Sequence, residues 1–287
     1  MNSPSVFRVA LLATVAMLAF AGNSLLCRLA LKGSHIDAAS FTAVRLLSGA
    51  VVLALIVRVR SAGLPRSGDW PSAVALFVYA AGFSWAYLQL SAATGALLLF
   101  GAVQLAMVAF GLWRGERLRL LQWLGFVAAC GGLVEMLLPG LESPPLQASV
   151  FMVAAGVAWG VYSLRGRGKG DPTAVTAGNF WRASVLGAVL FAAAWGQARA
   201  DAVGLAYALA SGALASGLGY SIWYTALRGL TPTTAASVQL TVPVLAAFGA
   251  VLFLGEAITL RLGLTSVLIL GGVALVIGAK APAPKAS

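Results

Sequence analysis

The sequence predicts an all-α integral membrane protein in which ten transmembrane helices form two inverted five-helix repeats. Hydrophobic residues make up 60% of the 287 positions and charged residues only 9%, with a mean hydropathy of +0.93. Soluble domains carry about a quarter charged residues, so a soluble core could not bury this much apolar surface. In addition, Gly115-Glu116 followed by Gly131-Gly132 recurs 140 positions later as Gly255-Glu256 followed by Gly271-Gly272. The chain is therefore predicted to contain one membrane unit twice.

Ten segments have the length of a membrane span, which takes about 17 to 25 apolar residues. They are residues 7–31, 38–57, 71–91, 93–113, 121–138, 147–165, 172–195, 203–227, 232–254 and 260–279. Several begin with helix signals, because Asp69, Asp171 and Thr231 each place a capping oxygen close to a proline of the first turn. We expect one membrane domain, with a first repeat at 1–140 and a second, inverted repeat at 141–287.

The first span also has an alternative interpretation. Arg8, an apolar run and Ala19-Phe20-Ala21 resemble a secretory signal with its cleavage site. We favour a span because the apolar run continues to Leu31, which is too long for a signal core. Without it, the sixth span would have no counterpart in the first half.

Loop charges predict the orientation, because short cytoplasmic loops collect lysine and arginine. If the first span starts inside, that side carries thirteen basic residues: Arg8, Arg58, Arg60, Arg66, Arg114, Arg117, Arg119, Arg165, Arg167, Lys169, Arg228, Lys280 and Lys285. The opposite side carries three, which are Lys32, Arg199 and Arg261. We therefore expect a multi-pass protein of the cell inner membrane with both termini in the cytoplasm.

The composition argues against several classes of function. The net charge is +11, but nucleic-acid binding needs basic residues clustered on one exposed face, and here they are scattered between apolar stretches. Cys27 and Cys130 lie in apolar segments without metal-site spacing, and the spans contain neither an HExxH motif nor paired carboxylates. We expect no enzyme activity, cofactor, metal or nucleic-acid partner, and we favour a monomer in the lipid bilayer.

Further matches between the halves extend the duplication over nearly the whole chain. They keep their order across three pairs of spans, at offsets of 137 or 138 positions, and the Gly-Glu motif adds the fourth pair. The pairs are Gly22 with Gly160, Arg45 with Arg182, Gly49 with Gly187, and Trp85 with Trp223.

Several motifs resemble those of one transporter family. They are Phe20-Ala21-Gly22-Asn23-Ser24, Phe41-x3-Arg45, the Gly-Glu that closes spans four and nine, and Pro243 before the second Gly-Glu. The chain resembles the drug/metabolite transporter superfamily, in its ten-helix EamA-type branch, over essentially all 287 residues. It is most similar there to exporters of amino acids, aromatic ones included. It departs from the pattern at Val103, where the second half has Pro243, and at Phe20-Ala21, where relatives often carry tryptophan before the glycine.

Aromatic side chains are the main candidates for a substrate-binding surface. Tyr79, Phe83 and Tyr87 recur every four residues and would share one helix face. Spans six and eight add Trp159, Tyr162, Tyr220, Trp223 and Tyr224. The alternative is that such rings only pack helices or anchor them at the membrane surface, as we expect of Trp70, Trp113, Trp123 and Trp195.

Polar groups inside the spans are few, and an unpaired one costs several kcal/mol there. We expect Gln104 and Gln239 to bind the amino and carboxyl groups of a substrate. Arg45 lies roughly 12 Å deep in its span. It either recognises a substrate carboxylate or, like Arg182 in the matching place, anchors helix ends, and we favour the structural role.

The remaining candidates have expected structural or gating roles. Pro243 should bend span nine near Gln239 and so act as a gate. Glu116, on the cytoplasmic side, and Glu256, on the outer side, should tether helix ends. The complete set is Asn23, Arg45, Arg182, Pro243, Glu116 and Glu256. Glu135 lies too close to the outer surface for a proton-coupling carboxylate, which needs a deep position where burial raises its pKa.

Together these features favour a secondary transporter that exports neutral amino acids, aromatic ones included, and similar small metabolites by alternating access. One rival is a drug or sugar-nucleotide carrier of the same superfamily, which should have a central acid or several cavity cations. The other rival is a non-transporting membrane scaffold, which should show no flux.

Overall fold

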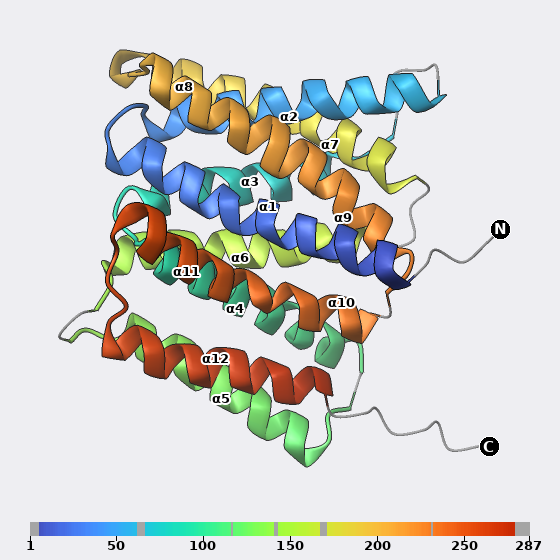
Figure 1. The fold of residues 1–287 in the computed structure, drawn as a ribbon, viewed down its shortest axis with the longest axis vertical. Coiled ribbons are helices and arrows are strands. Elements are labelled where there is room, and N and C mark those ends of the chain that lie inside the picture. Colours follow the sequence, from blue (N-terminus) through green and yellow to red (C-terminus); the bar gives the residue numbers. More distant parts are fainter. Residues whose placement is uncertain are drawn as a thin grey trace.

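Helices make up nearly all of the chain that the computed structural model describes, which is residues 6–61, 67–115, 117–140, 143–166, 171–230 and 232–278 (Figure 1). Eight predicted spans are single helices: α1 (Val6–Lys32), α2 (Ala38–Ser61), α3 (Trp70–Tyr87), α4 (Ala92–Trp113), α5 (Leu120–Leu137), α6 (Leu146–Gly166), α7 (Pro172–Ala193) and α12 (Leu260–Gly278). A 3-10 turn, η1 (Trp195–Gln197), follows α7. The third span is shorter than expected, because α3 ends at Tyr87 rather than near residue 91.

The other two predicted spans consist of several pieces. Span eight is α8 (Ala202–Leu209), the π-helical segment η2 (Ala210–Leu218) and α9 (Gly219–Leu227). Span nine is α10 (Pro232–Gln239) and α11 (Thr241–Leu254).

The interruption of span nine has a clear cause in the sequence. It lies at Leu240, three residues before Pro243. Proline has no N–H for the carbonyl of residue i−4, here Gln239, and its ring crowds that carbonyl. Thr241 Oγ1 donates a hydrogen bond to the Val238 carbonyl at 2.7 Å, which satisfies one group at the break. The helix is thus broken beside Gln239, where the sequence predicts a bend, while a gating role for Pro243 stays a prediction.

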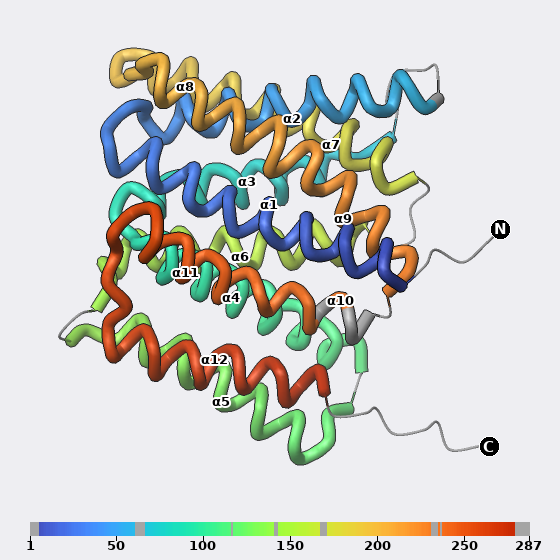
Figure 2. Tube along the Cα trace, viewed as in Figure 1, coloured from blue at the N-terminus to red at the C-terminus, as the bar shows by residue number. Residues whose placement is uncertain are grey.

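The two halves of the bundle run in opposite directions. In Figure 1, α1 and its counterpart α6 are antiparallel, and Figure 2 shows the start of α1 and the end of α12 at the same end of the bundle. The packing obeys the same symmetry, because α2 packs against its counterpart α7 and α5 against its counterpart α12. Likewise, α3 packs against α6 as α9 packs against α1. Within the described ranges, the predicted fold of ten spans in two inverted five-helix repeats is confirmed.

The outer surface of the bundle is apolar. Val189, Phe248 and Val267 are 63%, 67% and 72% exposed, and such side chains suit contact with lipid rather than water. Nine segments of the described chain are long and apolar enough to cross a membrane, and the tenth span, α3, is largely buried against α6 and α7. Trp70, Trp113, Trp123 and Trp195 are exposed near segment ends. The chain is therefore a multi-pass membrane protein.

Candidate functional site

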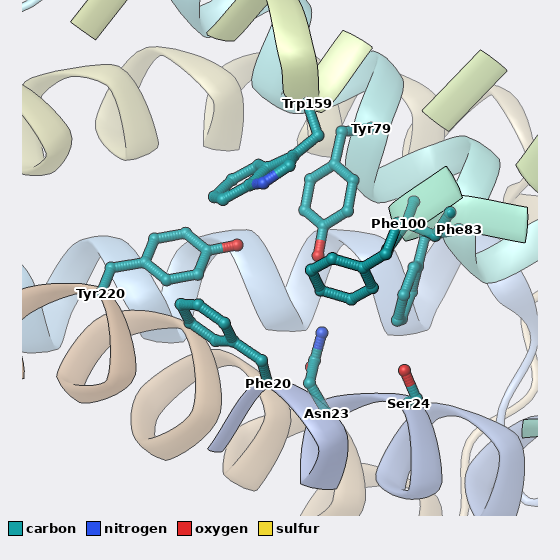
Figure 3. Close-up of a pocket in the computed structure, with 9 residues that line it drawn as sticks. Phe20, Asn23, Ser24, Tyr79, Phe83, Phe100, Trp159 and Tyr220 are labelled. Carbon is teal, nitrogen blue, oxygen red and sulfur yellow. The ribbon is translucent and has the colours of Figure 1, made fainter. Parts of the chain in front are cut away.

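A small cavity lies between the two repeats, near the middle of several spans (Figure 3). The first repeat contributes Phe20, Asn23, Ser24, Tyr79, Phe83, Leu99 and Phe100 to its lining, and the second contributes Trp159 and Tyr220. Its volume of about 20 Å³ is enough for about one water molecule, which needs roughly 10–15 Å³. This conformation is therefore closed, and a larger ligand requires the walls to move apart.

Aromatic rings form most of the cavity wall. The Trp159 ring centroid lies 4.9 Å from that of Tyr79 and 5.0 Å from that of Tyr220. Phe20 meets Tyr220 edge-on at 5.6 Å, and Phe83 lies 5.6 Å from Tyr79. Tilted and edge-on contacts at 4.5–7 Å are the favoured ring arrangements. The wall is thus a continuous cluster of rings from α1, α3, α6 and α9.

Four polar side chains reach into the cavity, two from α1 and one each from α3 and α9. Asn23 is buried, and its Oδ1 accepts a hydrogen bond from Ser211 Oγ at 2.6 Å, so its amide nitrogen points into the cavity (Figure 3). Ser24 Oγ is buried and lies within hydrogen-bonding reach of the Tyr87 hydroxyl. The hydroxyls of Tyr79 and Tyr220 also point inward (Figure 3). Ser211 belongs to η2, and π-helical turns are frequent at functional sites.

A buried positive charge lies behind the aromatic wall. Arg45 of α2 is 1% exposed. Its Nη2 donates to the Tyr79 hydroxyl at 2.7 Å, and its Nε donates to Ser216 Oγ at 3.3 Å. The guanidinium carbon lies 5.0 Å from the Tyr79 ring centroid and 4.8 Å from that of Phe83, which is within the range of cation–π attraction.

The repeat counterpart of Arg45 has different surroundings. Arg182 Nη1 donates to the backbone carbonyls of Ser67 at 3.0 Å and Gly178 at 2.9 Å. It therefore joins the connection before α3 to α7, as expected of an anchor. The hydrogen bonds of Arg45 instead go to side-chain hydroxyls, one of which lines the cavity.

Four of the nine residues expected to bind substrate line the cavity, namely Tyr79, Phe83, Trp159 and Tyr220. The other five, Gln104, Tyr162, Trp223, Tyr224 and Gln239, lie outside its lining. Trp223 packs behind Phe20 with ring centroids 6.2 Å apart, and Tyr162 packs behind Trp159 at 5.4 Å. These two rings support the wall from behind.

The two glutamines expected to bind substrate do not meet at the cavity. Gln104 is buried one helical turn beyond Phe100, and its Nε2 has no hydrogen-bond partner in the described structure. Gln239 is half-buried at the break of span nine. Tyr224 is likewise half-buried on α9. A substrate-binding role for these side chains stays a prediction.

Five lining residues were not expected to bind substrate: Phe20, Asn23, Ser24, Leu99 and Phe100. Of these, Asn23 was expected to have a structural or gating role. Phe20 precedes Asn23 by three residues, so helical spacing places both on one face of α1. That spacing was a usable signal for Phe20. Leu99 and Phe100 stand in a uniformly apolar stretch of α4, where no pattern distinguishes the inward face from the lipid face.

Comparison with known families supports the fold and gives it a function class. The EamA-like transporter family matches the chain twice, over residues 7–138 and residues 146–278. The chain belongs to the EamA-like transporter family. It is a membrane transporter of the drug/metabolite transporter superfamily, so a small-molecule substrate and a lipid environment follow from membership. The predicted family is thus confirmed, whereas the amino-acid branch stays a prediction.

Two further similarities extend over nearly the whole chain. A Pseudomonas aeruginosa protein described as "Uncharacterized protein PA1977" is 58% identical over 271 residues, which is 94% of each chain. A solved structure described as "Crystal structure of protein" superposes with a TM-score of 0.66 at 22% identity, covering 95% of this chain and 98% of the other. At that identity, the likeness to the solved structure shows the fold alone.

Large and small side chains occupy matching positions of the two EamA repeats. At the offset of 138 residues, Tyr79 corresponds to Gly217, Tyr220 to Gly82, Trp159 to Ala21, and Phe20 to Ala158. In each pair the large residue lines the cavity and its small counterpart does not. The helix framework is therefore symmetric, but the cavity wall is not.

At the end of the bundle opposite the start of α1, a nearly buried ion pair joins the two repeats. Arg28 Nε lies 3.1 Å from Glu256 Oε1, with both side chains nearly buried. Glu256 Oε2 accepts the backbone N–H of Ala92 at 2.7 Å, and Arg28 Nη1 donates to the carbonyls of Tyr87 at 3.0 Å and Leu88 at 3.2 Å. This Arg28–Glu256 closure ties α1, α3, α4 and the end of α11 together. Glu116, the repeat counterpart of Glu256, lies outside the described residues.

A second and larger hollow lies nearer the start of α1. It has a volume of about 550 Å³ and lies between α1 and the α10–α11 pair, with Val9, Met17 and Leu245 among its mostly apolar lining. Met17 lines this hollow, and Phe20, three residues later, lines the central cavity. About one helical turn of α1 therefore separates the two spaces.

Proposed function

We propose that this EamA-family transporter exports neutral amino acids, aromatic ones included, and similar small metabolites across the inner membrane. It works as a secondary transporter, by alternating access between the repeats at 1–140 and 141–287. Its amino and carboxyl termini lie in the cytoplasm, and it acts as a monomer.

The observation that carries this proposal is the chemistry of the central cavity. Aromatic rings from both repeats surround it, and the side chains of Asn23 and Ser24 and the hydroxyls of Tyr79 and Tyr220 reach into it. A predominantly apolar site with a few convergent polar groups suits a small molecule that has an apolar body and one polar end. An aromatic amino acid has this shape, because its ring can stack between Trp159, Tyr79 and Tyr220.

The residues of the cavity also bear on the energy source. No acidic side chain is among the described residues that line it. Proton antiport through this site requires a carboxylate that exchanges its proton with the substrate, and none is supplied here. We therefore propose facilitated export down the substrate gradient.

The conformation supports alternating access. The central cavity is closed, the Arg28–Glu256 closure lies at the end predicted to face outward, and the larger hollow lies at the end predicted to face the cytoplasm. A substrate entering from the cytoplasm passes the hollow and displaces Phe20 from its contacts with Tyr220 and Trp223. Export then requires the opposite closure to open.

Counterflow into proteoliposomes tests the proposal. Vesicles loaded with unlabelled amino acids should accumulate radiolabelled phenylalanine, tyrosine or leucine. Trp159→Ala should weaken apparent affinity about fivefold or more, because the wall loses its central ring. Trp181→Ala is the matched control, since Trp181 is 58% exposed on the outer face of α7, and its flux should stay at the wild-type level. Absence of flux over a wide amino-acid panel would refute the substrate class.

A separate measurement tests sidedness and coupling. Alkaline phosphatase fused after the last residue should be inactive in intact cells, as expected of a cytoplasmic carboxyl terminus. An imposed pH gradient should leave the steady-state distribution of amino acid unchanged. Accumulation that follows the gradient would show proton coupling and would contradict facilitated export.

A further inference from the structure

Arg45 is a buried cation whose known partners are all neutral. Its side chain is 1% exposed, and it hydrogen-bonds two hydroxyls, those of Tyr79 and Ser216. Its Nη1 has no hydrogen-bond partner, and no ion pair of Arg45 occurs in the part of the chain that the structure describes. Guanidinium groups stay protonated in proteins. A full positive charge is therefore held in the bundle without a countercharge.

Such an arrangement is costly unless another species supplies the missing charge. Charged side chains within spans are almost always paired, or they face a cavity that serves transport. The rings of Tyr79 and Phe83 provide cation–π attraction. This attraction offsets part of the cost of desolvating the guanidinium, but the rings are neutral and do not balance its charge. The Glu256 carboxylate, at the outer end of the bundle, is already held by Arg28 and the amide of Ala92. Because no carboxylate of the described residues pairs with Arg45, a ligand is the natural source of the countercharge.

The contact between Arg45 and Tyr79 leads directly into the cavity. The Tyr79 oxygen accepts a hydrogen bond from Arg45 Nη2, so its own proton points away from Arg45, toward the Tyr220 hydroxyl or a ligand oxygen in the cavity. A hydroxyl polarised by a cation is a stronger donor, and charge-assisted hydrogen bonds favour anionic acceptors. The Tyr79 hydroxyl faces the Asn23 amide nitrogen across the cavity, with Ser24 beside it (Figure 3).

We propose that the cavity holds its ligand by a carboxylate, which Tyr79, Asn23 and Ser24 hydrogen-bond and whose charge Arg45 balances from behind. The ligand class is a small monocarboxylate with an apolar body, whether or not it carries an amino group. The apolar body lies toward Trp159, Tyr220 and Phe20. Amines and cationic drugs without an acid group are excluded. This inference rests on the cavity being the substrate site, as in the proposed function.

The contrast between the repeats supports this assignment. Arg182 binds the backbone carbonyls of Ser67 and Gly178, as a helix anchor does. Arg45 is one residue out of the 138-residue register relative to Arg182, and it instead hydrogen-bonds a cavity hydroxyl on the aromatic side of the asymmetric wall. Arg45 is thus a positioning residue that acts on the ligand through Tyr79.

Three ligands that share a phenyl ring test the proposal. They are phenylalanine, phenylalaninamide and 3-phenylpropanoate. Two readouts are taken on the purified protein, namely counterflow in liposomes and ligand-induced thermal stabilisation in detergent. Phenylalanine and 3-phenylpropanoate should bind at least about tenfold more tightly than phenylalaninamide, because only they accept charge-assisted hydrogen bonds. Equal or better binding of the amide, or failure of both acids to stabilise the protein, overturns the inference.

Variants separate recognition from folding. Tyr79→Phe keeps the ring and removes the hydroxyl. It should reduce the preference for acid over amide about tenfold, and because it also removes an acceptor of Arg45, the ligand-induced shift is compared with the ligand-free melting temperature of the same variant. Arg45→Lys should retain part of the preference, and Arg45→Gln should abolish it. Arg182→Gln is the matched control, which should lower stability and leave the preference intact. An unchanged preference in Tyr79→Phe and in Arg45→Gln contradicts the assignment.

The outcomes also separate this inference from the proposed function. If both acids bind with the expected preference but no flux is seen, export is refuted and carboxylate recognition stands. If amino acids are transported without any preference over their amides, export stands and carboxylate recognition is refuted.

Discussion

The Arg28–Glu256 closure makes a quantitative prediction about how the outer end opens. The two side chains are 11% and 8% exposed, and the carboxylate also holds the first amide of α4. Removing one partner of a buried ion pair costs about 3–5 kcal/mol. Glu256→Gln keeps an acceptor and loses only the charge. The cost is therefore the difference in strength between charged and neutral hydrogen bonds, which is about 2 kcal/mol for the bonds to Arg28 and Ala92 together. Opening at this end should therefore become about 30-fold more favourable.

The chain contains its own reporter of this opening. Cys27 is fully buried, next to Arg28 on α1, and its thiol can react with a maleimide only when the closure opens. In a Cys130→Ser background, Glu256→Gln should label at Cys27 about 30-fold faster than the parent. Glu135→Gln is the control, because its pair with Arg261 at 3.3 Å has a 46% exposed carboxylate and such pairs contribute about 0–1 kcal/mol.

Two results would refute this reasoning. One is rapid labelling of Cys27 in the parent protein, which would mean that the outer end is already open. The other is a Glu256→Gln rate equal to the parent rate while Arg28→Met labels faster. That combination would assign the closure to the carbonyl bonds of Arg28 at Tyr87 and Leu88 rather than to the ion pair.

Three further predictions follow from other contacts. Pro243→Ala restores a backbone donor and should straighten span nine, so counterflow should slow severalfold with unchanged apparent affinity; an unchanged rate would argue against a gate there. Arg182→Met removes two hydrogen bonds to carbonyls and should lower the melting temperature by several degrees, measured by differential scanning fluorimetry. Burial by itself would raise the pKa of Asp37. Hydrogen bonds from Ser40 and the Arg199 amide outweigh this effect and bring the pKa below the usual range. Asp37 therefore stabilises the fold above about pH 4, so the melting temperatures of wild type and Asp37→Asn should differ at pH 7 and converge as the pH falls below that value.

The frame of this protein was predictable from the sequence because it depends on properties that repeat. Apolar length fixes the spans, and an odd number of spans between matching motifs, such as Glu116 and Glu256, fixes the inversion. The break of span nine follows from the covalent chemistry of Pro243. Each of these features is local or periodic, and each can be recognised without knowing which helix faces which.

The cavity was predictable only in part, because the rotation of each helix about its axis decides which side chains line it. In a soluble protein the polar face of a helix reveals that rotation, whereas here both the lipid face and the core face are apolar. Phe100 and Gln104 illustrate the difficulty, since they lie one turn apart on α4 and only Phe100 lines the cavity. The contrast between Arg45 and Arg182 was difficult to predict, because it depends on a shift of one residue between the 137-residue offset of this pair and the 138-residue offset of the flanking glycines, and one residue turns a side chain by about 100° around its helix.

The exchange of large and small residues across the repeats has an energetic consequence. In a perfectly duplicated transporter, the inward-open and outward-open states would be related by the pseudo-two-fold axis and would have equal free energy. Here Tyr79, Trp159, Phe20 and Tyr220 face Gly217, Ala21, Ala158 and Gly82 across that axis, so the two states pack different rings. A difference of about one to two kcal/mol between the two states would make the empty carrier about 5- to 30-fold more often open to one side of the membrane than to the other. The volumes of these side chains would thus decide to which side the empty carrier opens more often, before any substrate gradient acts.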